Sequence, residues 1–275
     1  MSKTHPAPLF RKEHILFIVL AGFFVANALI AEFIGVKIFS LEQTLGMPQL
    51  NLHLFGTARS FDLTAGVLLW PVIFVMTDVI NDYYGVRGVR ILSLLAAALI
   101  TYGFLMFFMG IQLVPSGFWP TSHVPLNASP EERAAILEKV SDFDYAFYVV
   151  FGQGLWIIAG SLVAFLVGQL LDAYIFKRIK SITGDGRVWL RATGSTLISQ
   201  LVDSFVVLFI AFYVSKKMTL DMVIGICIVN YIYKFAVAVV LTPVLYLVHG
   251  GIERYLGKEL ALEMRKRALS SQEEQ

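Results

Sequence analysis

Charged residues are scarce in this chain of 275 residues, where they make up 15% of the total; soluble globular domains carry about 25%. Hydrophobic residues account for 57%, and the mean hydropathy is +0.71. The shortage of charge excludes an ordinary soluble domain. Ten-residue segments of alternating polarity, which mark a transmembrane barrel, are also lacking. The composition therefore predicts an all-α, polytopic membrane protein.

Cysteine and the sequence motifs of common enzymes are equally sparse. A single cysteine, Cys227, excludes an intramolecular disulfide and a multi-cysteine metal site. The sequence has no His-Glu-x-x-His, no Gly-x-Ser-x-Gly and no Gly-x-x-x-x-Gly-Lys motif. The five histidines fall in predicted tails, loops or span ends. We therefore expect no cofactor, and any use of ATP would require a partner chain.

Apolar runs of membrane-spanning length occur six times in the sequence. A hydrocarbon core about 30 Å thick takes about 20 helical residues. The predicted spans are residues 15–31, 63–80, 89–113, 146–171, 192–214 and 222–248. Basic residues precede the first run, as in a signal peptide, but the spans that follow favour an uncleaved helix.

Lysine and arginine are distributed unevenly between the two sides of this layout. Fifteen of the 22 fall on the side that holds both termini, six on the other side, and Lys234 lies within the sixth span. Because cytoplasmic loops are enriched in basic residues, we predict that both termini are cytoplasmic. The predicted parts are a cytoplasmic tail at 1–14, a six-helix transmembrane domain at 15–248 and a second cytoplasmic tail at 249–275.

The longest polar interruption, residues 115–143, carries a helix start signal. Ser129 precedes Pro130, which is followed by two glutamates. A serine cap, a proline at the first helical position and acidic residues in the first turn all favour a helix beginning here. We predict a short surface helix that ends near residue 140.

Two predicted spans each carry a Gln-x-x-Asp pattern. Gln169 and Asp172 belong to the fourth span, and Gln200 and Asp203 to the fifth. Residues three or four apart share one face of a helix. Polar groups in lipid are costly unless they face a partner or a cavity. We therefore predict that both faces and Asp78 line one cavity.

Further polar residues extend this cavity across the membrane. They are Asn27 in the first span, Asp78 in the second, and Asn230, Tyr233 and Lys234 in the sixth. Asp203 and Lys234 each lie about halfway across their spans. Since two lone charges at that depth would be expensive, we predict that they form an ion pair.

The second span ends with two carboxylates, Asp78 and Asp82, that share a helix face. Such a pair could hold Mg²⁺ on a diphosphate, as in intramembrane prenyl-transferring enzymes. A second acidic motif of that kind is missing. The other interpretation places Asp82 in solvent at the headgroup level, with Gly85 ending the helix. We favour this interpretation for Asp82 and a functional role for Asp78.

The ordered set of polar residues resembles the queuosine precursor transporter family, also called the vitamin uptake transporter family. The matching positions are Thr77-Asp78, Tyr84-Gly85, Arg90, Gln169-x-x-Asp172, Ser195-Thr196 leading to Asp203, and Lys234 followed by Thr242-Pro243. The resemblance extends from the first predicted span to the sixth. It implies a transporter and not an enzyme.

The resemblance also implies a substrate and a location. Members would import 7-deazaguanine bases, such as 7-cyano-7-deazaguanine, 7-aminomethyl-7-deazaguanine or queuine, through the inner membrane for queuosine modification of tRNA. The partners would be a small-molecule nucleobase and the lipid bilayer, with no nucleic acid; a homodimer is left open. The expected substrate site is Asn27, Asp78, Gln169, Asp172, Gln200, Asp203, Asn230, Tyr233 and Lys234.

Two other functions remain open from the sequence. One is the Mg²⁺-dependent enzyme at Asp78 and Asp82, and the other is a substrate-binding subunit that needs an ATPase partner. The chemistry of the polar residues is compatible with a base. A carboxylate accepts two adjacent N–H donors of a guanine-like edge, carboxamides read neighbouring groups, and aromatic rings stack on its plane.

Overall fold

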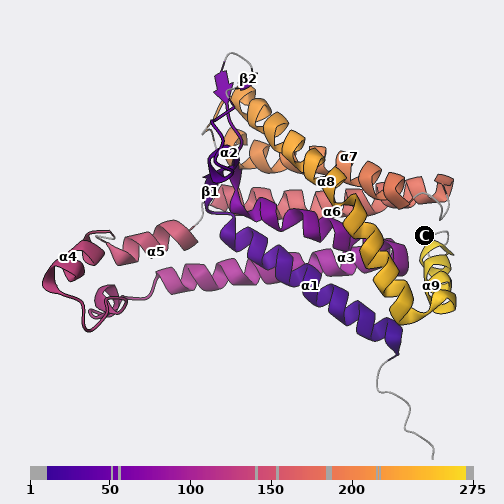
Figure 1. Cartoon of the computed structure of the whole chain (residues 1–275), viewed down its shortest axis with the longest axis horizontal. Helices are drawn as coiled ribbons and strands as arrows, with labels where there is room; N and C mark the ends of the chain where they lie inside the picture. Colours follow the sequence, from indigo (N-terminus) through magenta and orange to yellow (C-terminus); the bar gives the residue numbers. More distant parts are fainter. Residues whose placement is uncertain are drawn as a thin grey trace, which may run out of the picture.

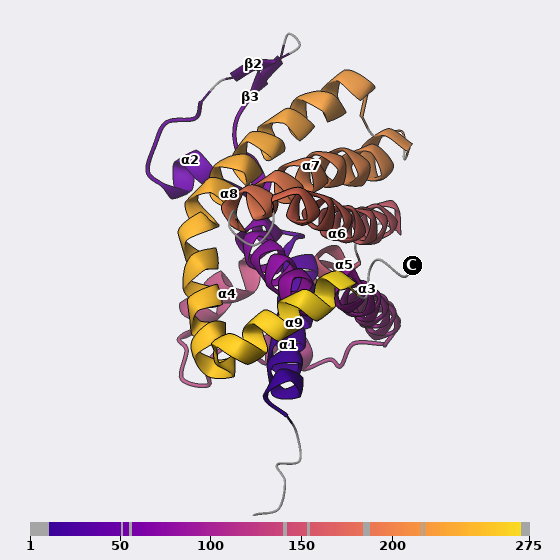
Figure 2. The same cartoon turned by 90° about the vertical axis from the view of Figure 1, so that its right-hand side faces the viewer.

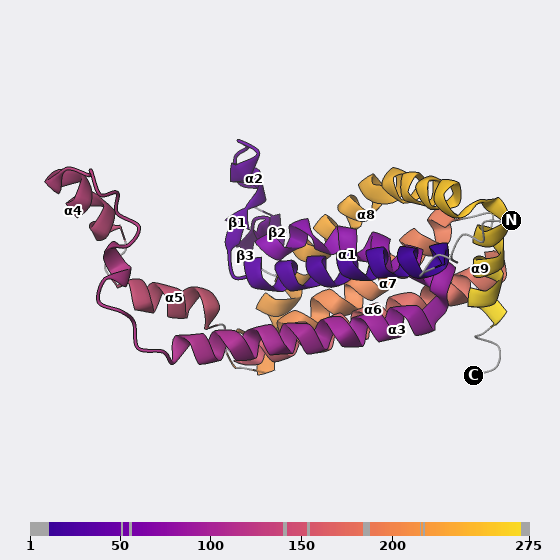
Figure 3. The same ribbon diagram turned by 90° about the horizontal axis from the view of Figure 1, so that it is seen from below.

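The structure is a computed structural model that describes residues 11–270, apart from residues 51, 55–56, 140–141, 153–154, 184–187, 215 and 217. Long helices run side by side along its longest axis (Figures 1 and 3). They are α1 (Lys12–Ile34), α3 (Trp70–Ile111), α6 (Leu155–Thr183), α7 (Val188–Leu208) with the π-helical η4 (Phe209–Val214), and α8 (Leu220–Leu256). Within the described residues, five helices are long and apolar enough to cross a membrane. The predicted all-α polytopic membrane protein is confirmed.

Helix α3 accounts for the difference between these five helices and the six predicted spans. Its 42 residues correspond to about 63 Å of helix, roughly twice the hydrocarbon thickness. Gly85 interrupts it with φ 69° and ψ −177°, a conformation that favours glycine. The chain runs along residues 70–84 and returns along residues 86–111 (Figures 1 and 3). The helix end predicted at Gly85 is therefore confirmed, and we refer to these segments as the first and second arms of α3.

In two of the predicted spans, the long helix begins later than the apolar run does. Residues 63 and 64 belong to β4 (Asp62–Thr64), which pairs antiparallel with β1 (Ile38–Ser40), and η1 (Ala65–Leu68) follows before α3 starts. The run at 146–171 is divided between α5 (Phe143–Phe151) and α6. Gly152 ends α5 with ψ 46°. Hydrophobicity continues across both breaks, so the apolar pattern did not reveal them.

Short elements at one end of the bundle connect the long helices. They are α2 (Leu41–Thr44), β2 (Leu52–Leu54), β3 (Thr57–Arg59), η2 (Trp119–Thr121) and α4 (Pro130–Glu138). In α4, Ser129 Oγ accepts from the Glu132 N–H at 3.2 Å, and the Glu132 carboxylate accepts from the Ser129 N–H at 2.9 Å. This reciprocal capping box confirms the helix start predicted at Ser129.

Glu42 anchors the segment between α1 and α3. Its buried carboxylate accepts hydrogen bonds from the Phe61 N–H at 2.9 Å, the Leu50 N–H at 3.4 Å and Ser40 Oγ at 3.2 Å. Burial raises the pKa of Glu42, but these donors outweigh it and bring the pKa below its ordinary value of 4.5. Glu42 is therefore ionised at neutral pH and ties together the two ends of this segment.

The core lies where α1, α3 and α6 meet. Its fully buried large side chains include Phe24 of α1, Ile73 and Ile100 of α3, and Phe165 of α6. Apolar side chains also cover the outside of the bundle. Among them, Leu247 of α8 is 75% exposed. An apolar exterior is what a lipid-facing surface requires.

The beginning of α1 and the last helix, α9 (Lys258–Ser270), lie at the same end of the bundle (Figures 1 and 3). Lys12 Nζ donates to the carbonyl oxygen of Tyr255 at 2.9 Å, which ties the start of α1 to the end of α8. Figure 2 faces this end and shows α9 crossing in front of the bundle. We call it the terminal end.

Candidate functional site

A cavity of about 40 Å³ lies between the first arm of α3, α7 and α8. Asp78 of α3, Gln200 of α7, and Tyr233 and Lys234 of α8 line it. The remaining wall is mostly apolar and comprises Val67, Trp70, Pro71, Phe74, Val75, Ala238, Leu241, Thr242 and Leu245. A mostly apolar cavity with a few converging polar groups is typical of a small-molecule site.

Helical spacing explains why these side chains converge. On α3 the lining residues Trp70, Phe74 and Asp78 recur every four residues, and on α8 Lys234, Ala238 and Leu245 recur at helical intervals. Residues so spaced occupy one face of a helix. Each helix therefore presents one stripe to the cavity, with one or two polar positions in it.

Gln200 offers an unused hydrogen-bond acceptor in the cavity wall. Its side chain is 5% exposed, and its Oε1 has no hydrogen-bond partner in the described part of the chain. A buried acceptor without a donor is costly, and buried polar groups are nearly always hydrogen-bonded. An N–H donor on a bound molecule would satisfy this oxygen.

The predicted pair of Asp203 and Lys234 is confirmed. Lys234 Nζ donates to Asp203 Oδ2 at 2.6 Å, and the side chains of Lys234 and Asp203 are 13% and 15% exposed, respectively. Lys234 lines the cavity, whereas Asp203 lies behind it on α7. Gly168 of α6 faces this pair, and an added Cβ there would lie in ordinary van der Waals contact with Asp203 Cβ, at 3.4 Å.

Gln169 and Asp172 of α6 are buried beside the cavity and are not among its lining residues. Thr77 Oγ1 donates to Gln169 Oε1 at 2.5 Å, and Ser199 Oγ donates to Asp172 Oδ1 at 2.9 Å. Thr77 and Ser199 immediately precede the lining residues on α3 and α7. Gln169 and Asp172 therefore hold those helices in register around the cavity.

The two predicted asparagines also lie outside the cavity lining. Asn27 Nδ2 donates to the Phe23 carbonyl one turn earlier in α1, at 2.7 Å. Asn230 is half-buried on α8, one turn before Lys234. The structure thus brings Asp78, Gln200 and Lys234 together with Tyr233, and it does not bring either asparagine to the cavity.

Glu32 is a buried acidic residue that the sequence did not single out. It is 8% exposed near the end of α1. Its carboxyl group hydrogen-bonds with Ser161 of α6 and lies close enough to the Asp203 carboxylate for the two to repel each other. A signal existed, because Phe24 and Ala28 are spaced at helical intervals and Glu32 continues their face. The mixed polar and apolar segment that begins at Glu32 concealed the last turn of this helix.

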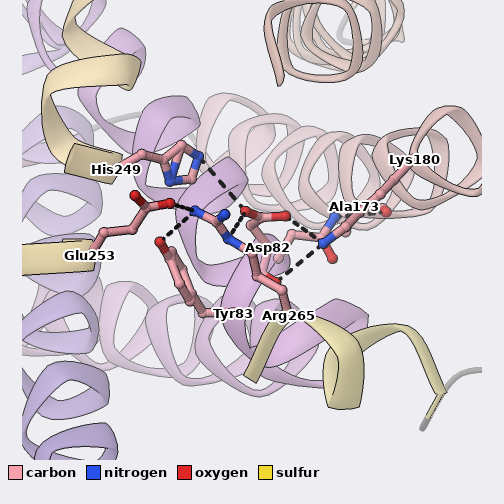
Figure 4. Close-up of polar contacts among 8 residues, drawn as sticks. Asp82, Tyr83, Ala173, Lys180, His249, Glu253 and Arg265 are labelled. Atoms are coloured by element: carbon pink, nitrogen blue, oxygen red, sulfur yellow. Dashed lines mark hydrogen bonds and ion pairs between the residues drawn. The ribbon is translucent and has the colours of Figure 1, made fainter. Parts of the chain in front are cut away.

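A second polar cluster surrounds Asp82, one turn after Asp78 (Figure 4). Asp82 is fully buried, so the prediction that it lies in solvent is wrong. Lys180 of α6 donates to its carboxylate, and Arg265 Nε of α9 lies 3.1 Å from Asp82 Oδ2. The sequence missed both cations because they follow the predicted fourth and sixth spans. We call Asp82, Tyr83, Lys180, Glu253 and Arg265 the terminal cluster.

These cations argue against the magnesium enzyme considered from the sequence. Lys180 and Arg265 already supply positive charge to Asp82, and they would repel a divalent cation. Within the described residues, no group of three His, Cys, Asp or Glu residues could hold a metal ion. The carboxylate of Asp82 is therefore already balanced by the side chains of the protein.

Arg265 is held in its cationic form by this environment. Burial alone lowers the pKa of its guanidinium, but the Asp82 carboxylate raises it, and the net pKa lies above the ordinary value. Arg265 therefore remains charged at any physiological pH, and contacts to it do not depend on a proton.

Membrane-length helices around a small cavity, with a buried ion pair at its wall, are typical of a membrane transporter for a small molecule. The family model described as "Putative vitamin uptake transporter" matches residues 64–248. The chain belongs to this family. Its members are transporters and not enzymes, which confirms the class implied by the resemblance.

The names of similar proteins are consistent with this family. The chain is 34% identical over 200 residues to a "Probable queuosine precursor transporter" of Bacillus subtilis, covering 71% of this chain and 76% of the relative. It is 26% identical over 197 residues to the "Queuosine precursor transporter" of Escherichia coli, covering 70% and 73%. No solved structure matches the chain.

Proposed function

We propose that this protein imports 7-deazaguanine queuosine precursors through the inner membrane. Its relative in Escherichia coli carries the name "Queuosine precursor transporter", and its relative in Bacillus subtilis the name "Probable queuosine precursor transporter". The observation that carries the proposal is the convergence of Asp78, Gln200 and Tyr233 on one cavity. These side chains supply a carboxylate, a carboxamide and an aromatic ring.

Each group suits one part of a 7-deazaguanine base. The carboxylate of Asp78 can accept two adjacent N–H donors of a guanine-like edge, and charge strengthens both hydrogen bonds. Gln200 Oε1 can accept a further donor. Tyr233 can stack on the flat ring. Lys234 Nζ donates to Asp203 and has further N–H groups for the carbonyl oxygen of the base.

The size of the cavity supports movement as part of transport. Its volume of about 40 Å³ is far below the roughly 300–1,000 Å³ of small-molecule sites. A base fits only when the first arm of α3, α7 and α8 separate. This is compatible with alternating access, in which the site opens to one side of the membrane at a time.

Uptake in cells that can neither make nor import the precursors tests the proposal. We expect expression of this chain to restore queuosine in tRNA when labelled 7-cyano-7-deazaguanine, 7-aminomethyl-7-deazaguanine or queuine is supplied. Expression without any of these bases is the control. If all three bases leave tRNA unmodified while the protein is in the membrane, the proposed substrate class is wrong.

Purified protein in lipid vesicles separates this proposal from an ATPase-dependent subunit. We expect uptake of unmodified base by this chain alone. Uptake only after addition of an ATPase partner would assign the chain to the binding-subunit class. The same preparation shows whether the protein is a monomer or a homodimer.

We also propose that the terminal end, with both chain termini, faces the cytoplasm, as the 15 basic residues on that side indicate. Tails 1–14 and 249–275 would then flank the transmembrane domain. Reporter fusions at Gln275 and within residues 115–143 test this orientation. We expect a cytoplasmic signal only from the fusion at Gln275, and the reverse result would invert the transporter.

A further inference from the structure

The terminal cluster lies between the cavity and the terminal end. On α3, Asp82 follows the lining residue Asp78 by four residues, about 6 Å of helix. On α8, His249 and Glu253 follow the lining residue Leu245 at the same spacing. Along both helices, the terminal cluster therefore lies between the cavity and α9, which is at the terminal end.

Arg265 joins three structural elements within this cluster. One of its terminal nitrogens, Nη2, donates to Tyr83 Oη and to Glu253 Oε1, each at 2.8 Å. Its Nε lies 3.1 Å from Asp82 Oδ2. Figure 4 shows the guanidinium between these groups, with Lys180 on the other side of Asp82. The contact between Asp82 and Arg265 is nearly dry, since Asp82 is fully buried and Arg265 is 14% exposed.

Helix α9 is also attached to the bundle by apolar side chains on one of its faces. Its buried apolar residues are Ala261, Met264 and Ala268, which lie at helical spacing beside Arg265. Leu260 is partly buried against the same core. Because two of the three buried side chains are alanines, Met264 supplies most of the buried apolar surface, and the guanidinium adds the polar attachment. Gly257 precedes α9 with φ 89° and forms a break between α8 and α9. Helix α9 can therefore pivot as a unit when Arg265 is released.

The charges of the cluster allow that release. Asp82 is also paired with Lys180, so the departure of Arg265 leaves a neutral pair inside. Glu253 is 40% exposed and can be hydrated. His249 Nε2 lies 3.9 Å from Asp82 Oδ2. When α9 moves away, no buried charge is therefore left without a partner. Breaking most buried ion pairs leaves such an unpaired charge, and this is why it is strongly destabilising.

We propose that α9 is the gate at the terminal end of the transport path and that Arg265 closes it. In the closed arrangement the terminal cluster seals the cavity from that end. In the open arrangement Arg265 leaves Asp82, Tyr83 and Glu253, and α9 swings about Gly257 to release the transported base. The inference rests on the proposed function only for the identity of that base.

Cysteine labelling on α9 measures opening directly. The native thiol is removed by Cys227→Ser, which keeps the hydrogen bond to the Ser204 carbonyl. Ala261→Cys then places a thiol on the buried face of α9, where the native residue is 2% exposed. We expect slow reaction with a maleimide in the purified protein. Adding Arg265→Gln should raise the rate about tenfold, because charged hydrogen bonds that hold α9 are lost.

Arg267→Gln is the matched control. It makes the same chemical change two residues along α9, where the side chain is 64% exposed, and it should leave the labelling rate within about twofold, as exposed pairs contribute little. Leu262→Cys, on the exposed face of α9, should label fast in every background. Should Arg265→Gln reduce folding, Glu253→Gln removes the negative charge of one partner of Arg265 at a half-exposed position and should give an intermediate rate. The gate is refuted if the thiol introduced by Ala261→Cys reacts equally fast with and without Arg265→Gln, and equally fast with and without Glu253→Gln.

Measurements of binding and of uptake distinguish a gating role of Arg265 from a purely structural one. With Arg265→Gln, we expect the affinity for 7-cyano-7-deazaguanine to remain within about threefold while uptake falls at least about tenfold. Equal loss of both would show that Arg265 merely supports the fold and would overturn the gate. If the parent protein binds no 7-deazaguanine base yet Arg265→Gln still exposes the thiol introduced by Ala261→Cys, the proposed function fails and the gate stands.

Discussion

Lys234→Met should abolish uptake and lower the free energy of unfolding by about 3–5 kcal/mol. The substitution keeps the approximate length of the side chain and removes its charge. Asp203, which is 2.6 Å from Lys234 Nζ in the parent protein and mostly buried, is then left without its cation in an apolar bundle. Thermal unfolding of the purified protein and uptake into vesicles measure the two effects.

The reciprocal variant shows whether the loss belongs to the pair. Asp203→Asn should destabilise the protein to a similar extent, and the double variant should recover part of the stability because neither charge is left alone. Lys37→Met removes an exposed lysine outside the bundle and serves as the control. Losses of stability that add up in the double variant would mean that the pair contributes nothing.

The pair also provides a coupling between the substrate and the helices. Lys234 lines the cavity on α8, and its partner belongs to α7. A substrate donor or a proton that competes for Asp203 would free Lys234 and weaken the contact between these helices. A ligand shifts a conformational equilibrium only through such differential contacts. Transport should therefore stay lost in the double variant even where stability returns.

The Asp203–Lys234 pair could be predicted because it depends on depth alone. Span boundaries and the distribution of basic residues place both side chains near the midplane. Because a lone charge in lipid is costly, the two side chains are then expected to form an ion pair. Rotation of a helix about its axis is harder to predict. The polar face of α6 is buried against Thr77 and Ser199 and does not line the cavity, since packing against α3 and α7 decides which way it turns.

The terminal cluster could not be predicted for a different reason. Tyr83 and Arg265 are 182 residues apart, and Arg265 lies in a charged segment that is typical of a solvated tail. Only the tertiary fold shows that α9 returns across the bundle. The sequence likewise places Asp82 in solvent, because its two cations, Lys180 and Arg265, come from other helices.

Asp78→Asn should weaken binding of a 7-deazaguanine base by about 100-fold or more and reduce uptake accordingly. The change preserves the shape of a side chain that is 4% exposed. It replaces one acceptor oxygen by an NH₂ group, which points a donor at the donors of the base. A hydrogen bond to a charged group contributes about 1.5–3 kcal/mol and a neutral one about 1 kcal/mol, so losing one charged hydrogen bond and weakening the other to a neutral one accounts for this factor.

Variants at neighbouring positions make the Asp78 result specific to the cavity. Gln200→Leu removes the free acceptor of the cavity wall and should cost about tenfold in affinity, in line with one neutral hydrogen bond. Asp221→Asn changes an exposed aspartate in the first turn of α8 and should leave affinity unchanged. Titration of the purified proteins with 7-cyano-7-deazaguanine gives all three values. Parent-like affinity in Asp78→Asn would remove this carboxylate from the substrate site, because no other lining residue in the described part of the chain is a carboxylate that could accept the paired N–H donors of the base in its place.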